Sequence, residues 1–92
     1  MSWKVVFKKR AEKQLKKLPE DIQAIVRALV LDMQFRGPVM GEWPNYSKLG
    51  KNQHHCHIKN GLPSYVVCWE VTDKNIKLIE VYYAGTRENA PY

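Results

Sequence analysis

Apolar and polar positions along the chain change their spacing twice. Residues 3–7 are short, β-branched and aromatic, which predicts a first strand. From Phe7 onward the apolar residues recur every three or four positions, at Phe7, Ala11, Leu15 and Leu18, as on one stripe of a helix. Basic residues fill the opposite face, so this first helix is predicted to be amphipathic and strongly basic.

A second helix is predicted to begin at Pro19 and to end before Gly37. Proline fits the first helical position, and Glu20 and Asp21 favour the positive end of the helix dipole. The sequence Gly37-Pro38 ends the pattern. Its apolar stripe consists of Ile22, Ile25, Val26, Leu29 and Met33. The tight turn between the two helices predicts an antiparallel helical hairpin.

After a loop at residues 38–45 the spacing becomes two, as in strands. The segments with this pattern are 46–49 (short), 54–59, 64–71 and 76–83, separated by turns at 60–63 and 72–75. With the short segment at 46–49 left out of the count, the predicted order is β-α-α-β-β-β. The expected fold is α+β, a single domain over residues 1–92 in which an antiparallel sheet packs on an N-terminal helical hairpin.

The composition indicates a basic protein with one modest core. Fifteen Lys and Arg face nine Asp and Glu in 92 residues, a net charge of +6. Such a surface attracts polyanions and also suits an acidic protein partner. The chain has no apolar run of the roughly 18 residues that a membrane span needs, and no signal-peptide pattern, so a cytoplasmic protein is expected.

Three histidines stand close together, at His54, His55 and His57. Because alternate residues of a strand share a face, His55, His57 and Lys59 are predicted to point together, while Cys56 points toward the helices. His54 is expected to be polar surface. The pair His55 and His57 has the spacing of zinc or nickel ligands, but no carboxylate or cysteine pair completes a recognised set, so neither a metal nor a cofactor is expected.

Several short motifs occur in a fixed order along nearly the whole chain. They are Leu15-Lys16-Lys17-Leu18-Pro19, Lys48-Leu49-Gly50, His57-Ile58-Lys59, the strand from Tyr65 to Val71, and Gly85-Thr86-Arg87-Glu88 followed by Tyr92. In this order, and with these predicted elements, the sequence resembles the RelE/ParE toxin superfamily of bacterial toxin–antitoxin systems.

The resemblance implies a metal-independent mRNA endoribonuclease that acts with the ribosome and inhibits translation. It also implies an acidic antitoxin that covers the basic face, and a toxin–antitoxin complex that binds operator DNA through the antitoxin. The residues expected to contact RNA or the ribosome are Lys8, Lys9, Lys13, Lys16, Lys17, Lys48 and Lys51.

Cleavage of RNA without a metal needs a base, an acid and positive charge on the phosphate. His57 is the expected acid or base, because histidine titrates near neutral pH, and His55 shares its face. Lys59 and Arg87 are expected to hold the phosphate. Tyr92 is expected to stack on a base of the RNA or to assist proton transfer.

Two other functions remain open at this point. Val66 stands where RelE-type nucleases carry an arginine, which favours a ParE-like inhibitor of DNA gyrase. The third possibility is a degenerate, non-catalytic toxin that only binds an antitoxin or RNA. DNA damage, translation arrest or normal growth on expression would separate the three.

Overall fold

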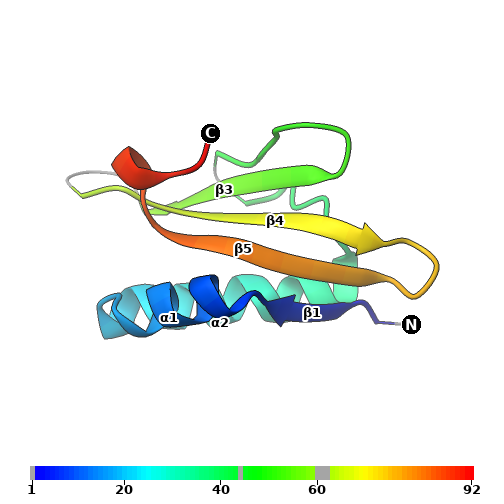
Figure 1. The fold of residues 1–92 in the computed structure, drawn as a ribbon, viewed down its shortest axis with the longest axis horizontal. Coiled ribbons are helices and arrows are strands. Elements are labelled where there is room, and N and C mark those ends of the chain that lie inside the picture. Colours follow the sequence, from blue (N-terminus) through cyan, green and yellow to red (C-terminus); the bar gives the residue numbers. More distant parts are fainter. Residues whose placement is uncertain (1, 44, 60–62) are drawn as a thin grey trace.

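The computed structural model describes residues 2–43, 45–59 and 63–92. Its elements are β1 (Lys4–Phe7), α1 (Lys9–Lys16), α2 (Glu20–Arg36), β2 (Ser47–Lys48), β3 (Gln53–Lys59), β4 (Tyr65–Asp73), β5 (Leu78–Thr86) and the short 3-10 helix η1 (Arg87–Asn89). Both α-helices lie on one side of the sheet, and the C-terminal segment lies on the other (Figure 1). The predicted α+β fold is confirmed. Most of the turn predicted at 60–63 lies outside the described residues.

The sheet has the strand order β1-β5-β4-β3-β2. Strands β2 to β5 pair antiparallel with their neighbours, as predicted. The first strand differs, because β1 runs parallel to β5 and the sheet is therefore mixed. A parallel pair needs a long connection between its strands, and here the helices and the other strands separate β1 from β5 along the chain. The pattern of residues 3–7 predicts a strand but not its partner or direction.

The last strand begins two residues later than predicted. Asp73 Oδ1 accepts hydrogen bonds from the backbone N–H groups of Asn75 (2.9 Å) and Ile76 (3.3 Å), which holds these residues in the turn. Lys77 then takes a left-handed conformation with a φ of 53°. Ile76 is consequently 65% exposed instead of entering the sheet.

The main core lies between the sheet and the helices. Its fully buried side chains are Ala11, Val26, Leu29, Met33, Met40, Cys56, Val67, Trp69, Ile79, Val81 and Ala84. The helical stripes predicted from the sequence supply the helix side of this cluster. The Trp69 Nε1–H donates to the Pro38 carbonyl at 2.9 Å, so the buried indole has a partner. No helix within the described ranges is long and apolar enough to cross a membrane.

His54 belongs to this core, and its prediction as polar surface is wrong. Alternation along β3 turns His54, with Cys56, toward the helices, and His54 is only 3% exposed. Its Nδ1 lies 2.6 Å from the Tyr46 hydroxyl, and its ring stacks on Trp69 at a centroid distance of 6.0 Å. A buried polar ring is tolerated here because it is both hydrogen-bonded and stacked.

Gly37 ends α2 in a conformation reserved for glycine. Its φ and ψ are 90° and −167°, and its N–H donates to the Met33 carbonyl at 2.8 Å. A Cβ at this position would lie 2.9 Å from Nε1 of Trp3. The absence of a side chain therefore allows the chain to leave the helix beneath the Trp3 ring.

We expect Gly37→Ala to lower the free energy of unfolding by about 1–3 kcal/mol, because alanine is strained in this backbone region. Gly41→Ala is the matched control, since a Cβ at Gly41 would meet no atom within 4 Å. Urea unfolding followed by tryptophan fluorescence measures both. Equal stability of the two variants would contradict the strain argument.

The buried His54 should make stability depend on pH. Burial lowers the pKa of His54, and the Lys48 charge lowers it further. The unfolded chain then binds more protons than the folded one. The contribution of neutral His54 to the free energy of unfolding is therefore fully present above the ordinary pKa of about 6.5, and it is lost as the pH falls toward the lowered pKa of the folded state.

We expect the free energy of unfolding to decrease between about pH 7.5 and about pH 5.5, and to decrease less steeply in His54→Gln. Part of the slope should remain, because the pKa values of His55 and His57 are also lowered. Urea unfolding at several pH values tests this, and identical slopes for the two proteins would exclude His54 as a contributor.

Candidate functional site

The face of the sheet that points away from the helices carries His55 and His57, because side chains alternate along β3. The backbone register pairs His55 with Cys68 and His57 with Val66. Cys56 is fully buried on the opposite face. The two cysteines are free thiols on opposite sides of the sheet.

This second face is partly covered by apolar packing. Val66, Cys68 and Tyr83 form a small buried cluster, against which Leu49, Tyr82 and Ala90 pack. Gly85 pairs with Val66, and a Cβ there would lie 2.8 Å from the Tyr83 hydroxyl, which donates to the Thr86 carbonyl at 2.6 Å. The cluster gives the histidines an apolar floor.

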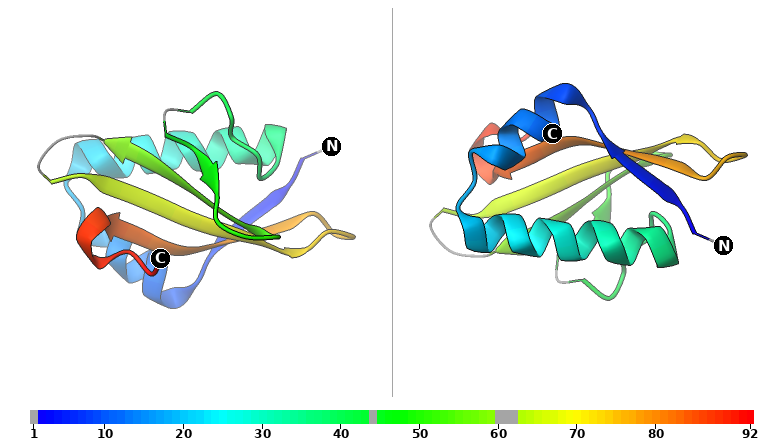
Figure 2. Two further views of the ribbon diagram at one scale, coloured as in Figure 1. Left: turned by 90° about the horizontal axis from the view of Figure 1, so that it is seen from above. Right: turned by 90° about the horizontal axis from the view of Figure 1, so that it is seen from below.

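The C-terminal segment folds back over this floor (Figures 1 and 2). The Arg87 N–H donates to the Ser64 carbonyl at 3.0 Å and so ties η1 to the start of β4. The Tyr92 ring lies 4.6 Å from the His55 ring between centroids, and its hydroxyl lies 3.4 Å from His57 Nε2. The fold thus brings Tyr92 onto both histidines of β3.

Strand β2 orients one of these histidines. His55 Nδ1 lies 3.2 Å from the Ser47 carbonyl oxygen and 3.3 Å from the Ser47 hydroxyl. A carbonyl only accepts hydrogen bonds, so we assign the proton of the neutral ring to Nδ1. The lone pair then lies on Nε2, the nitrogen left for proton transfer.

The histidines of the site favour their neutral form. Burial lowers the pKa of His55, a backbone hydrogen bond to Ser47 opposes the shift, and the neighbouring His57 lowers it further. Burial also lowers the pKa of His57, and the Arg87 charge adds to this effect. Both rings are therefore proton acceptors at pH 7. Burial raises the pKa of Tyr92, so its hydroxyl keeps its proton.

An open depression of about 490 Å³ lies beside these side chains. Its described lining consists of Asn45, Tyr46, Ser47, His55, His57, Ser64 and Arg87. They come from the loop before β2, from β2, β3, the segment before β4, and η1. The size falls within the range of small-ligand sites. The depression combines neutral proton acceptors with a guanidinium, a combination suited to binding a phosphodiester.

The sequence predicted most of this group. His55, His57 and Arg87 line one depression, and Tyr92 contacts both histidines. Lys59 pairs with Tyr65 through its backbone, after a register shift between His57 and Lys59, but its side chain lies outside what the structure describes. Its predicted place on the histidine face stays a prediction.

Sequence reasoning missed four residues of the lining, Asn45, Tyr46, Ser47 and Ser64. Serine and asparagine in loops carry no distinctive signal. The only available hint was the short strand at 46–49, whose pairing with β3 places Ser47 opposite His55.

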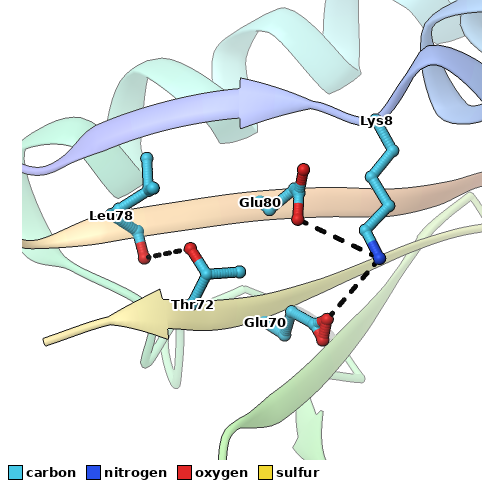
Figure 3. Close-up of polar contacts among 5 residues, drawn as sticks. All are labelled: Lys8, Glu70, Thr72, Leu78 and Glu80. Atoms are coloured by element: carbon cyan, nitrogen blue, oxygen red, sulfur yellow. Dashed lines mark hydrogen bonds and ion pairs between the residues drawn. The ribbon is translucent and has the colours of Figure 1, made fainter.

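The predicted basic residues differ in their surroundings. Lys8 Nζ lies 3.9 Å from a Glu70 oxygen and 4.0 Å from a Glu80 oxygen, between two carboxylates on paired strands (Figure 3). Lys16 lies 3.9 Å from Glu12 on the same helix. The remaining predicted contacts are exposed, namely Lys9, Lys13, Lys17, Lys48 and Lys51. Within the described ranges, no three His, Cys, Asp or Glu side chains form a group that could hold a metal ion.

Comparisons with known proteins identify the fold. No family model matches the sequence, and no curated protein matches it. A mutant of the E. coli toxin RelE in the free state aligns over 98% of this chain and 88% of its own, with a TM-score of 0.76 and 14% identity. The RelE of the archaeal RelE–RelB complex from Pyrococcus horikoshii aligns over 98% and 100%, with a TM-score of 0.73 and 15% identity.

The toxin–antitoxin complex RelBE2 from Mycobacterium tuberculosis gives a similar result. It covers 95% of this chain and 100% of the matched one, with a TM-score of 0.69 and 20% identity. The chain therefore has the fold of RelE-like toxins of toxin–antitoxin systems, and the resemblance read from the sequence is confirmed at the level of the fold.

Proposed function

We propose that this protein is the toxin of a type II toxin–antitoxin system and acts as a metal-independent, ribosome-associated mRNA endoribonuclease that inhibits translation. The observation that carries this proposal is the convergence of His55, His57, Arg87 and Tyr92 at one depression on the open face of a RelE-like sheet.

In this reaction the 2′-hydroxyl of RNA attacks the adjacent phosphorus. A base removes the 2′-proton as the bond from phosphorus to the 2′-oxygen forms. The bond to the 5′-oxygen breaks, and an acid protonates that oxygen. The products are a 2′,3′-cyclic phosphate and a 5′-hydroxyl end. Every group required is an ordinary side chain, so the proposed reaction needs no metal.

The geometry supports particular roles. His57 is the proposed acid or base, with its Nε2 beside the Tyr92 hydroxyl. His55 is its proposed partner, held by Ser47 so that Nε2 is available. Arg87 would neutralise the developing charge on the phosphate oxygens. Lys59 would add a second charge from β3, a role that rests on its place in the sequence. Tyr92 would stack on a base of the RNA or assist proton transfer.

The partners follow from the same proposal. Two of the matched structures are complexes of RelE with RelB and of RelBE2, which supports an antitoxin for this chain as well. An acidic antitoxin would cover the basic surface, operator DNA would be bound through the complex, and the protein would work in the cytoplasm. The exposed lysines of the first helix, with Lys48 and Lys51, would face ribosomal RNA.

One observation keeps a second candidate in view. Val66, the residue standing where RelE-type nucleases have arginine, is fully buried in the floor of the site. A toxin that lacks this charge and has no nuclease activity would act through binding alone, as a ParE-like gyrase inhibitor or as a non-catalytic partner of an antitoxin. The retained histidines and Arg87 favour the nuclease.

Induced expression in growing bacteria, with transcriptome-wide mapping of new 5′ ends, tests the nuclease. We expect new ends within translated frames. His57→Ala should lower the rate of the cleavage that produces them by roughly 10²–10⁴, because an acid–base group is removed. Arg87→Ala should also abolish cleavage. Arg27→Ala removes an exposed arginine from α2 and should behave as wild type.

Intact mRNA on expression of the wild type would reject the nuclease. Growth arrest with double-strand DNA breaks would then indicate a gyrase inhibitor, and normal growth a binding protein. Full-rate cleavage by His57→Ala would exclude His57 as the acid or base while leaving the activity itself in place.

The pH dependence gives a separate test. If His55 and His57 share the acid and base roles, the rate is greatest between their two pKa values, and both values are lowered in the free protein. We expect kcat/KM for cleavage of ribosome-bound mRNA to be greatest below about pH 6.5. A maximum above pH 7.5, roughly one unit higher, would exclude this pair.

A further inference from the structure

A second hollow region also adjoins η1, whose first residue, Arg87, lines the proposed catalytic depression. Adjoining hollows of about 550 Å³ and about 300 Å³ share Arg10, Gln14, Tyr83 and Asn89 in their walls. We call these two hollows together the α1 groove. Residues of α1, of the end of β5 and of η1 line it. Helix α1 and η1 lie at the same end of the sheet (Figures 1 and 2).

The α1 groove has a fixed wall of helix α1. Arg10, Gln14 and Lys17 are spaced at four and three positions, so they follow one another along the same side of the helix. The middle residue anchors this side, because Gln14 Oε1 accepts a hydrogen bond from the Ala84 N–H of β5 at 3.1 Å. The cations on either side of Gln14 therefore stand over the open edge of β5.

The α1 groove carries positive charge that is not held in ion pairs. Among the described residues, Arg10 and Lys17 take part in no ion pair, and no Asp or Glu lines the groove. Lys8 also lines it, but its charge is shared between Glu70 and Glu80 (Figure 3). Two cations thus remain available to a polyanion.

The other walls suit a nucleic acid strand. Tyr82 is half-buried and lines the smaller hollow, and burial raises its pKa to about 12, so this aromatic side chain is uncharged. Asn89 contributes an amide that also donates to the Thr86 hydroxyl at 3.3 Å. Backbone phosphates beside cations and bases beside aromatic rings are the usual contacts of single-stranded nucleic acid.

The position relative to the catalytic depression indicates the occupant. Arg87 lines that depression. Thr86 and Asn89, which lie before and after Arg87 along the chain, line the α1 groove. A strand whose phosphate is held at Arg87 can continue over η1 toward Arg10 and Lys17.

We propose that the α1 groove binds the backbone of single-stranded RNA next to the cleavage site, with Arg10 and Lys17 holding its phosphates. The choice of RNA over an acidic protein segment rests on the proposed nuclease function. The groove also discriminates among the basic residues of the first helix, since Lys9 and Lys13 do not line it.

A fluorescein-labelled 2′-O-methyl RNA of about 12 nucleotides is a suitable probe, because it binds like single-stranded RNA but has no 2′-hydroxyl to attack. Fluorescence anisotropy over a range of salt concentrations gives both the affinity and its salt dependence. We expect the double variant Arg10→Ala/Lys17→Ala to bind about tenfold more weakly at low salt. The slope of log K against log salt should shrink by about 1.4, which is about 0.7 for each phosphate that is no longer neutralised.

Arg27→Ala/Lys74→Ala is the matched control, since it removes one exposed arginine and one exposed lysine, and so the same charge, from outside the groove. It should keep the wild-type slope. Equal weakening in both double variants would show diffuse attraction and overturn the proposal, as would failure of the wild type to bind the probe. Competition by poly-glutamate as strong as by unlabelled RNA of equal charge would overturn it in favour of an acidic protein partner.

The outcome is separable from that of the nuclease proposal. If the protein binds RNA through Arg10 and Lys17 but leaves mRNA intact, the proposal for the α1 groove stands and the proposed nuclease activity is rejected. Cleavage that persists in a protein with no groove-dependent binding would do the reverse. Circular dichroism of each variant checks that its helices are folded.

Discussion

The register of β3 determines what both faces of the sheet carry. Because side chains alternate along a strand, a slip by one residue would exchange the two sets. His54 and Cys56 are in the core in the observed register, while His55 and His57 are on the open face. The His54 ring stacks with both Tyr46 and Trp69, which also stack with each other, and this makes the core side specific. The same contacts therefore fix the catalytic candidates on the other side. His54, which has no proposed catalytic role, thus positions His55 and His57, which have one.

The open face becomes a site because the chain returns to cover it. A solvated strand face would leave histidines at their ordinary pKa. After η1, Ala90 packs on the Val66–Cys68–Tyr83 cluster, and Tyr92 lies against the rings of His55 and His57. Burial is the leading cause of the lowered pKa of both histidines. The C-terminal segment therefore helps to lower the pKa of the two histidines, and it also contributes the Tyr92 side chain to the site.

The sequence predicted the elements well and their partners less well. Helix stripes and strand alternation depend on neighbours along the chain, so the helical hairpin, the β3–β4 pairing and the shared face of His55 and His57 were all accessible. The parallel pairing of β1 with β5 depends on the path of the whole chain and was not. His54 was misplaced because a polar residue type outweighed the alternation that assigns it to the core. Ser47 was missed because its role follows from a cross-strand register.

The basic surface shows most clearly why composition alone is insufficient. The positive charges read from the sequence look equivalent, yet Lys8 is held by two glutamates and Lys16 by Glu12. A cation whose field is already balanced gains less from a phosphate than one that is not, since binding must first weaken its existing pair. Arg10 and Lys17, spaced along one side of α1 and standing over the free edge of β5, have no such competitor in the described structure. If this surface binds a polyanion as proposed, local pairing, rather than net charge, would decide where.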